Sequence, residues 1–498
     1  MNHDQDQRDA RAIPLTNRRN FLKKTAAAAI ATSAASITPG SADAEMQPNP
    51  SSARKPNVII YIADQFRADF IGANGLNTTT RTPNLDAVAQ RGTSFTGAIT
   101  NQPVCSPSRS VLLTGRYATE THVWRNAHPI NPELPTLASE FRKAGYTANM
   151  IGKWHLAPKD PAKGGGDGFV RPEFRGGFLD LWEGANEFEW TTHPYEGTIW
   201  NGAGQEIKFD HESRIEFITD RAERFLKQKH DKPFFLYVSQ LEPHQQNDAK
   251  RMIAPKGYAD RFSNPFVPAD LRSFPGNWQS QLPDYYGCVE AIDHSVGRIL
   301  KTLDEENLTE NTIFVFLSDH GCHFMTRNAE YKRSPHNASI RVPLIAQGPG
   351  FDTGQEIPDI IGNIHVMPTL LDAAGIKVPA SVKGKTVMPL LSDPQARKEW
   401  KNVELIQISE SMTARAIRTK DWCYCVVDRD PKSMTKPSST HYDEYLFYDE
   451  AGDPYELVNL TGRQEYRAQA NILKNQLKQL IVSAGEPEPE IATTAIYP

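Results

Sequence analysis

The sequence predicts an α/β fold with a large, mixed and mostly parallel sheet flanked by helices, followed by a small C-terminal α+β subdomain. Two patterns indicate this. Before about residue 400, short apolar runs rich in β-branched residues alternate with helical patterns, as expected for strands that are buried on both faces of a parallel sheet. After residue 400 the apolar residues alternate with polar ones, which is typical of an antiparallel sheet.

The larger domain contains five strand-like runs with helical patterns between them. The predicted strands are 57–63, 148–151, 234–239, 312–317 and 343–346, and the predicted helices are 82–91, 135–144, 215–227 and 286–303. Apolar residues at helical spacing and a stop at Gly145 support these helices. In such sheets functional groups gather beyond the carboxyl ends of the strands, so polar residues at those points are candidates for a site.

The remaining segments divide the chain further. Residues 45–56 are rich in Pro and Ser and are predicted to be a linker, so that the larger domain covers 57–400 and the subdomain 401–498. The stretch 161–204 is rich in Gly and Trp and is interpreted as a long ordered loop, and a loop of that length is usually functional. In the subdomain, segments 414–418, 422–427 and 445–448 are predicted strands, and 473–484 is a predicted helix that stops at Gly485.

The first 44 residues have the composition of a targeting segment. Arg18-Arg19 is followed by Phe-Leu-Lys-Lys, then by an uncharged run rich in Ala, Ser and Thr, and then by Ala42-Asp43-Ala44. This order resembles a twin-arginine export signal that is cleaved after Ala44. It predicts a bacterial protein that is exported to the periplasm or beyond by the twin-arginine machinery. The alternative is an N-terminal membrane anchor, for which the run is short and weakly apolar.

Composition and charge exclude several classes of protein. The 498 residues carry a formal net charge of −5, which argues against a nucleic-acid binder that relies on charge. Beyond the N-terminal segment no run is apolar enough to span a membrane, so no membrane attachment is expected after cleavage. Five cysteines in a chain of this length exclude a disulfide-stabilised scaffold, and an odd number leaves at least one thiol unpaired.

The segment with the clearest chemical meaning is Cys105-Ser-Pro-Ser-Arg-Ser-Val-Leu-Leu-Thr-Gly-Arg116. Pro107 favours a helix start, which would place Cys105 at a helix N-terminus where an anion is stabilised. The segment resembles the sulfatase signature at every fixed position, and for a match this long a purely structural cysteine is the weaker reading. The resemblance implies a fold of the alkaline-phosphatase superfamily. It also implies that a maturation enzyme converts Cys105 to formylglycine, the nucleophile.

Three further segments are similar to sulfatase motifs. Gly145-Tyr-Thr-Ala-Asn-Met-Ile-Gly-Lys-Trp-His155 resembles the second signature, apart from Ala148, and the resemblance makes Lys153 and His155 catalytic. The strand that leads to Pro243-His244 and the lysine before Ser339-Ile-Arg-Val-Pro343 also match. They imply His244 and Lys332 as further catalytic residues.

Two pairs of residues that follow predicted strands resemble the sulfatase metal site. These pairs are Asp64-Gln65 and Asp319-His320, and together with Cys105 they imply a divalent cation. Hard oxygen ligands favour Ca²⁺. Gln65 is neutral, and the imidazole of His320 is a ligand that is less typical of Ca²⁺. A divalent cation other than Ca²⁺ is therefore an alternative.

The resemblance also implies the role of each side chain. The cation, Arg109, Lys153 and Lys332 neutralise the sulfate group, and this preorganised field is expected to be the largest catalytic term. A hydroxyl of the hydrated aldehyde attacks sulfur, and His244 protonates the departing alcohol. His155 then removes a proton so that sulfate leaves.

The implied reaction is the hydrolysis of sulfate esters, with a sulfated saccharide as the expected substrate outside the cytoplasm. Two alternatives stay open. One is a phosphodiesterase or phosphonate monoester hydrolase on the same fold, and the other is a non-catalytic binder of sulfated glycans with an unmodified Cys105. Trp182, Trp190 and Trp200 in the 161–204 segment are candidates for stacking on sugar rings or for packing.

If Cys105 is modified, four thiols remain: Cys288, Cys322, Cys423 and Cys425. Cys423 and Cys425 are two residues apart on a predicted strand and therefore point to the same face, which is a poor geometry for a bond between them.

Overall fold

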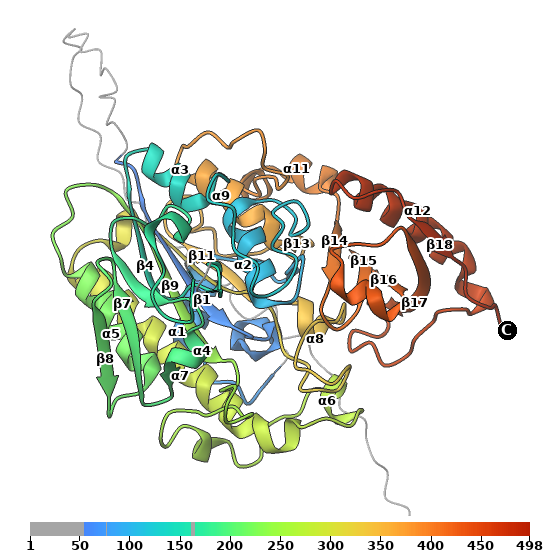
Figure 1. The fold of residues 1–498 in the computed structure, drawn as a ribbon, viewed down its shortest axis with the longest axis horizontal. Coiled ribbons are helices and arrows are strands. Elements are labelled where there is room, and N and C mark those ends of the chain that lie inside the picture. Colours follow the sequence, from blue (N-terminus) through green and yellow to red (C-terminus); the bar gives the residue numbers. More distant parts are fainter. Residues whose placement is uncertain (1–53, 76, 161–164) are drawn as a thin grey trace, which may run out of the picture. The chain divides into compact units, whose positions relative to one another are not determined.

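A computed structural model of the chain describes residues 54–75, 77–160 and 165–498, and Arg54–Pro498 form one compact unit. The predicted export signal and nearly all of the predicted linker lie outside the described residues. The unit contains a large sheet with helices on both faces and a smaller sheet near the C-terminus (Figure 1). This arrangement confirms the predicted fold class.

The large sheet has 11 strands, and its centre is parallel. In sheet order the strands are β12 (Gln355–Glu356), β2 (Thr93–Ser94), β11 (Leu344–Gln347), β10 (Thr312–Ser318), β1 (Asn57–Asp64), β9 (Phe234–Pro243), β4 (Thr147–Lys153), β5 (Trp182–Ala185), β7 (Glu196–Asn201) and β6 (Thr192–His193), with β8 (Glu206–Asp210) paired to β7. The five neighbours from β10 to β5 run parallel, and antiparallel strands extend the sheet on both sides.

The central strand β1 is buried on both faces, as its continuous apolar run predicts. Ile59 and Tyr61 belong to one core cluster and Val58 and Ile60 to another, because successive side chains of a strand point to opposite faces.

The helices divide between these two faces. On the first face lie α1 (Pro83–Arg91), α5 (Arg214–Leu226) and α7 (Trp278–Glu305), and on the second face lie α2 (Cys105–Thr114), α3 (Leu137–Lys143) and α9 (Val366–Ala373). Capping boxes begin two of them, with Thr136 before α3 and Ser213 before α5. Each such cap satisfies backbone N–H groups that the first turn leaves unpaired.

The C-terminal sheet has five strands and one long helix. They are β14 (Val403–Ile408), β15 (Thr413–Thr419), β16 (Trp422–Asp428), β17 (His441–Asp449), β18 (Glu490–Ala492) and α12 (Arg467–Ser483). One face of the sheet packs on α12, and the other packs on Ile99, Ile340 and Ile360 of the larger domain. The predicted strands and helix of this region are therefore confirmed, with longer bounds.

The interpretation of 161–204 as one long loop is wrong from Trp182 onward. This part forms β5, the short helix α4 (Phe188–Thr191), β6 and β7, which extend the large sheet. The strands are only two to six residues long, and their Gly- and Trp-rich sequence has no clear alternation. Their strand conformation follows from pairing with β4 and with one another, which local sequence does not reveal.

The last of the helices predicted for the larger domain also begins earlier than predicted. Helix α7 starts at Trp278 rather than near Tyr286 and contains Pro283. A proline inside a helix removes one backbone hydrogen bond, and burial of Leu282, Tyr285 and Tyr286 in the core offsets this loss.

The carboxyl end of β4 depends on a glycine. Gly152 has φ +106°, and a Cβ atom there would lie 2.0 Å from the backbone oxygen of Ser239 on the neighbouring strand β9. The close approach of these two strands places Lys153, the next residue, beside the end of β1.

We therefore expect Gly152→Ala to lower the free energy of unfolding by about 3 kcal/mol or more, because it combines a steric clash with an unfavourable φ. Chemical denaturation measures this change. Gly145→Ala is the matched control, since Gly145 also has a positive φ but no atom within 4 Å of the added Cβ. It should cost about 1 kcal/mol, and equal losses in the two variants would contradict the steric argument.

Candidate active site

The carboxyl ends of the parallel strands bring the predicted site residues together. Asp64 ends β1, Lys153 ends β4, and His244 and Asp319 follow β9 and β10. Because these four strands are neighbours and run in the same direction, their last residues meet at one edge of the sheet.

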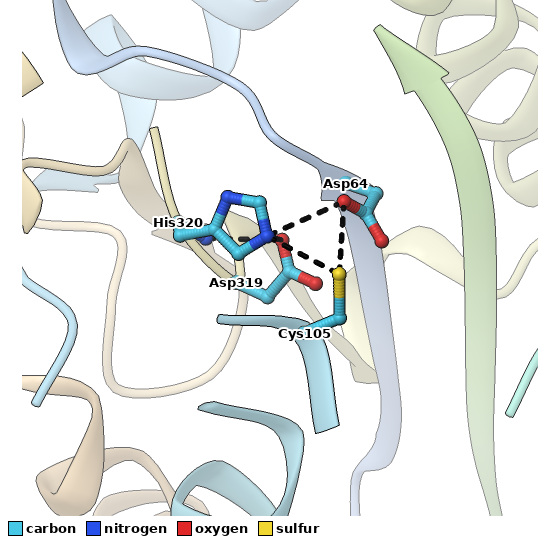
Figure 2. Close-up of side chains that lie close together, drawn as sticks. All are labelled: Asp64, Cys105, Asp319 and His320. Carbon is cyan, nitrogen blue, oxygen red and sulfur yellow. Dashed lines mark hydrogen bonds and ion pairs between the residues drawn. The ribbon is translucent and has the colours of Figure 1, made fainter. Parts of the chain in front are cut away.

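Cys105 is the first residue of α2, as predicted, and its side chain lies at the centre of this edge. The Sγ atom lies 3.1 Å from Lys332 Nζ, 3.4 Å from His320 Nε2 and 3.7 Å from Asp64 Oδ1. Figure 2 shows Cys105, Asp64, Asp319 and His320 pointing toward one another. The three residues in contact with Sγ come from different places in the chain: Asp64 ends β1, His320 follows β10, and Lys332 lies in the loop farther along.

The surroundings of Cys105 stabilise negative charge. Burial alone would raise the pKa of this thiol, but the ammonium groups of Lys153 and Lys332 reverse the effect and lower the pKa well below its usual value. A negatively charged group at the position of Sγ is therefore favoured.

Arg109 bridges the two carboxylates of the predicted metal site. Its Nε donates to Asp319 Oδ2 at 3.0 Å and its Nη2 to Asp64 Oδ2 at 3.1 Å. The other terminal nitrogen donates to Ser239 Oγ at 2.8 Å and more weakly to Lys153 O at 3.3 Å. The guanidinium is fully buried, so these bonds make Arg109 a residue that orients the carboxylates.

Lys153 lies between two acidic groups. Its Nζ is 2.8 Å from Asp64 Oδ2 and 3.2 Å from Glu189 Oε2. Burial would raise the pKa of Glu189, but Lys153 and His155 outweigh it and lower the pKa to about 2. Glu189 is therefore ionised and holds Lys153 from the side opposite Asp64.

His155 faces a second carboxylate. Its Nε2 lies 3.4 Å from Glu187 Oε1, and its Nδ1 is buried without a hydrogen-bond partner. Burial and Lys153 act to lower the pKa of His155, but Glu187 and Glu189 outweigh them and raise it to about 10. The imidazole is thus protonated at neutral pH, and any cation that binds nearby will lower this pKa.

Lys332 and His244 form a pair beside Cys105. Lys332 Nζ lies 3.1 Å from His244 Nε2, and His244 Nδ1 lies 2.6 Å from the backbone oxygen of Gln245. Burial and Lys332 lower the pKa of His244. Burial acts to lower the pKa of Lys332 as well, but Cys105 and Asp64 raise it. His244 is therefore neutral, with Nδ1–H donating to Gln245 and Nε2 accepting the hydrogen bond from Lys332.

The residues predicted as metal ligands fit a divalent cation. One ligand atom each from Asp64, Cys105, Asp319 and His320 lies within 4.8 Å of the others. His320 Nδ1 lies 3.0 Å from the backbone oxygen of Gly321, which accepts a hydrogen bond from Nδ1–H. The neutral ring therefore keeps a lone pair on Nε2 that can bind a metal.

Gln65 is the only predicted ligand with an uncharged amide side chain, and its backbone N–H donates to Asp319 Oδ1 at 3.1 Å. Its Nε2 donates to Gln245 Oε1 at 2.9 Å, and its Oε1 is buried without a partner. That oxygen is available as a neutral ligand, and a role for Gln65 at the metal stays a prediction.

Sequence reasoning missed Glu187 and Glu189. Both lie in the segment that was interpreted as a loop, between Asn186 and Trp190. The only available signal was two carboxylates in an otherwise aromatic stretch. Their contact with Lys153 and His155 depends on β5 pairing with β4, which brings α4 to the site.

The aromatic side chains of this segment differ in their surroundings. Trp182 is buried and Trp200 is half-buried against the core, so both serve packing, whereas Trp190 is 48 % exposed beside Lys159.

The loop that carries Lys332 is held by both parts of the chain. His323 Nε2 lies 3.0 Å from the backbone oxygen of Lys332, and burial lowers the pKa of His323 to about 3, so the ring is neutral. Farther along, Asn337 N donates to Glu456 Oε2 at 2.7 Å, and His336 Nε2 lies 3.1 Å from Tyr448 OH. Glu456 and Tyr448 belong to the C-terminal part, which therefore helps to position Lys332.

The four other cysteines are free and buried, among them Cys423 and Cys425 on β16, which share one core cluster. Within the described parts of the chain, no helix has the length and apolar character needed to cross a bilayer.

Comparison with known proteins connects this geometry to a family. The sulfatase family model matches residues 56–376, and the model for the C-terminal region of N-sulphoglucosamine sulphohydrolase matches residues 330–483. An ulvan-active sulfatase of Formosa agariphila is 30% identical over 450 residues, with 87% of this chain and 82% of the relative covered. An N-acetylglucosamine-6-O-sulfatase of Bacteroides thetaiotaomicron is 23% identical over 529 residues, with 90% of each chain covered.

A solved structure supports the same fold. The phosphonate monoester hydrolase of Agrobacterium radiobacter superposes with a TM-score of 0.66 at 22% sequence identity, covering 86% of this chain and 96% of that one.

The bridge formed by Arg109 leads to a prediction about cation binding. Lysine has one ammonium group and does not reproduce the forked donor geometry of arginine. We expect Arg109→Lys to raise the Ca²⁺ or Mn²⁺ concentration at the midpoint of a thermal-shift titration by about 10- to 100-fold. Arg415→Lys, which alters a buried arginine paired with Glu486 in the C-terminal sheet, should move the midpoint by less than about twofold. Similar shifts in both variants would contradict the assignment.

Proposed function

Because the chain belongs to the sulfatase family and has the fold of the alkaline-phosphatase superfamily, we propose that it hydrolyses sulfate esters of a sulfated carbohydrate at the site around Cys105. The main support is the position of Cys105 at the helix N-terminus, within 3.1 Å of Lys332 Nζ and beside the ligand cluster of Asp64, Asp319 and His320. The similarity to an N-acetylglucosamine-6-O-sulfatase supports a sugar substrate.

Conversion of Cys105 to formylglycine by a maturation enzyme is part of the proposal. The hydrated aldehyde supplies one hydroxyl group for attack on sulfur and a second whose deprotonation allows sulfate to leave, which a thiol does not offer. The thiol Sγ marks where these oxygens would stand, and the lowered pKa of Cys105 beside Lys153 and Lys332 supports an anion at this position.

Asp64, Asp319, His320 and the side chain at position 105 would hold the divalent cation, with Gln65 as a further candidate. Two carboxylates favour Ca²⁺, while the imidazole of His320 is a ligand that transition metals also accept. The bound cation would supply positive charge for the sulfate oxygens and for the nucleophilic hydroxyl.

Lys153 and Lys332 provide the remaining positive charge. Both ammonium groups lie in the buried pocket around Cys105, where they interact strongly with an anion because little water screens them. Arg109 acts indirectly, because its donors are used by Asp64, Asp319, Ser239 and the Lys153 carbonyl.

Lys332 and His244 together are proposed to protonate the leaving alcohol. In the resting site the shared proton is on Lys332, since the pKa of His244 is lowered and that of Lys332 is raised. Transfer from Lys332 Nζ to His244 Nε2 and from there to the alcohol oxygen would leave the imidazole neutral again and Lys332 as a neutral amine, which takes up a proton from water before the next cycle.

His155 is proposed to remove a proton from the residue at position 105. This role requires a neutral imidazole, and the positive charge of an occupied metal site would lower the pKa toward that state. Glu187 is proposed as a positioning residue that holds the ring through Nε2 and leaves Nδ1 free.

Export by the twin-arginine machinery and a periplasmic or extracellular location complete the proposal. They rest on the sequence of residues 1–44 and on the exposure of sulfated polysaccharides outside the cytoplasm.

The proposal is tested first at Cys105. We expect Cys105→Ala to lower kcat/KM on an aryl sulfate by at least about a thousandfold, and mass spectrometry of the Cys105 peptide from native-host protein to show an aldehyde. Cys288→Ala, which changes another buried cysteine, should keep nearly full activity. If Cys105→Ala retains about a tenth of the activity, the mechanism is wrong. An unmodified, inactive thiol in native protein would instead favour a binder of sulfated glycans.

The second candidate function is a phosphodiesterase or phosphonate monoester hydrolase, which the structural similarity to the Agrobacterium radiobacter enzyme favours. Rates on matched aryl sulfate and aryl phosphodiester substrates separate the two. A sulfatase hydrolyses the sulfate faster, and a faster phosphodiester reaction would replace the proposed function.

A further prediction concerns Glu187. Glu187→Gln should lower kcat about 10- to 100-fold while KM changes little, because the carboxylate orients His155 and does not contact the sulfate. Steady-state kinetics on an aryl sulfate measure this. Glu183→Gln is the control, since Glu183 pairs with Arg221 of α5, a helix on the opposite face of the sheet from α2. A change confined to KM would mean that Glu187 binds substrate.

A further inference from the structure

A second cleft lies at the junction between the larger domain and the C-terminal helix. It has a volume of about 790 Å³ and is lined by the segment after α2, the residues that precede β14, and one face of α12. Glu399, the last residue of α11 (Pro394–Glu399), and Gln476 on α12 both line it, and Figure 1 shows where these two helices lie in the fold.

The cleft is separate from the active site. Helix α2 begins with Cys105 and ends with Thr114. Tyr117, which lines the cleft, lies three residues after the end of this helix. A ten-residue helix is about 15 Å long, so the two sites lie toward opposite ends of α2.

The walls of the cleft carry unneutralised positive charge. Lys383, Lys385 and Lys401 line it and are exposed. Within the described part of the chain neither Lys385 nor Lys401 forms an ion pair, and Lys383 approaches Glu120 only to 3.8 Å. In contrast, Lys474 and Lys478 on α12 are both paired with glutamates. Two lysines without an ion pair and a third with only a long one, in a chain of net charge −5, mark a local site for anions.

The one exposed carboxylate among the lining residues, Glu399, balances at most one of the three lysine charges. Its Oε1 also accepts a hydrogen bond from Gln395 Nε2 at 2.7 Å along its own helix. The other acidic residue of the cleft, Glu404, is buried and engaged by His365 at 2.7 Å.

The floor and the α12 side have the chemistry of a sugar-binding surface. Trp400 is half-buried, and its indole is fixed by a hydrogen bond from Nε1 to Ile360 O at 3.0 Å. Gln476 and Gln479 present exposed amide groups from α12. A fixed aromatic ring with amides around it provides an apolar face and hydrogen-bonding partners for a sugar ring.

We propose that this cleft binds a sulfated stretch of the polysaccharide remote from the ester that is hydrolysed. The proposal rests on the proposed function, since it takes the substrate to be a sulfated polymer. Lys385 and Lys401 contact sulfate groups, Trp400 and the two glutamines contact the sugar, and the cleft retains the chain while its esters reach Cys105.

The test uses dextran sulfate as the probe and neutral dextran as its uncharged counterpart, at physiological salt. In the mature full-length enzyme, the double variant Lys385→Glu/Lys401→Glu should raise the Kd for dextran sulfate about tenfold. Its kcat/KM on a small aryl sulfate should equal that of the wild type, because neither lysine lies near Cys105. Melting temperatures of the variants confirm that they are folded.

The matched control is Lys420→Glu/Lys436→Glu. These lysines are exposed, do not line the cleft and change the net charge by the same amount. The control should leave the Kd within about twofold of the wild type. An equal loss in both double variants, or no loss in the cleft variant, overturns the proposal. Failure of the wild type to hydrolyse aryl sulfate would refute the proposed function and not the binding cleft, which the Kd values report independently.

Discussion

The buried bridge between Asp64, Arg109 and Asp319 is the interaction on which the rest of the site depends. Asp64 and Asp319 stand at the ends of the neighbouring strands β1 and β10, where two like charges without a partner would be strongly unfavourable. Arg109 donates to both at 3.0 and 3.1 Å. Arg109 lies on α2, which begins with Cys105, so the bridge between the carboxylates also holds the proposed nucleophile position against the ends of the strands.

The balance of buried charge explains how an acidic chain can bind an anionic substrate. Lys153 is shared between Asp64 and Glu189, and Lys332 is shared between Cys105 and His244. None of these side chains has appreciable contact with water, so each charge acts at short range and with little screening. The positive field is therefore confined to the pocket, while the molecule as a whole remains negative.

The C-terminal sheet belongs to the same compact unit as the site. The segment after Lys332 reaches this sheet through Asn337 and His336, which contact Glu456 and Tyr448. His323 holds the carbonyl of Lys332 from the other side. Displacement of the C-terminal part would therefore disturb the position of Lys332, the proposed catalytic lysine, although among the described residues no side chain of that part forms a hydrogen bond or ion pair with Cys105.

The sequence by itself determined the class of fold and the order of the main strands and helices, and it named most of the residues that the structure brings together around Cys105. Continuous β-branched runs are only stable as strands buried on both faces, which is why β1 and β10 were predictable. The motifs around Cys105, Lys153 and His244 were long enough to indicate their chemistry through family resemblance.

Tertiary structure alone decided the rest. The strands from Trp182 onward are too short to show an alternation of apolar and polar residues in the sequence. They adopt strand conformation because β5 pairs with β4 and the later strands pair with one another. The partners of Arg109, the contact of Glu187 with His155 and the lysine-lined cleft join residues from 32 to more than 200 positions apart. Local sequence patterns determine which secondary structure a segment prefers. Contacts between distant residues depend on where the packed sheet places each segment, and that placement is set by the packing of the whole core.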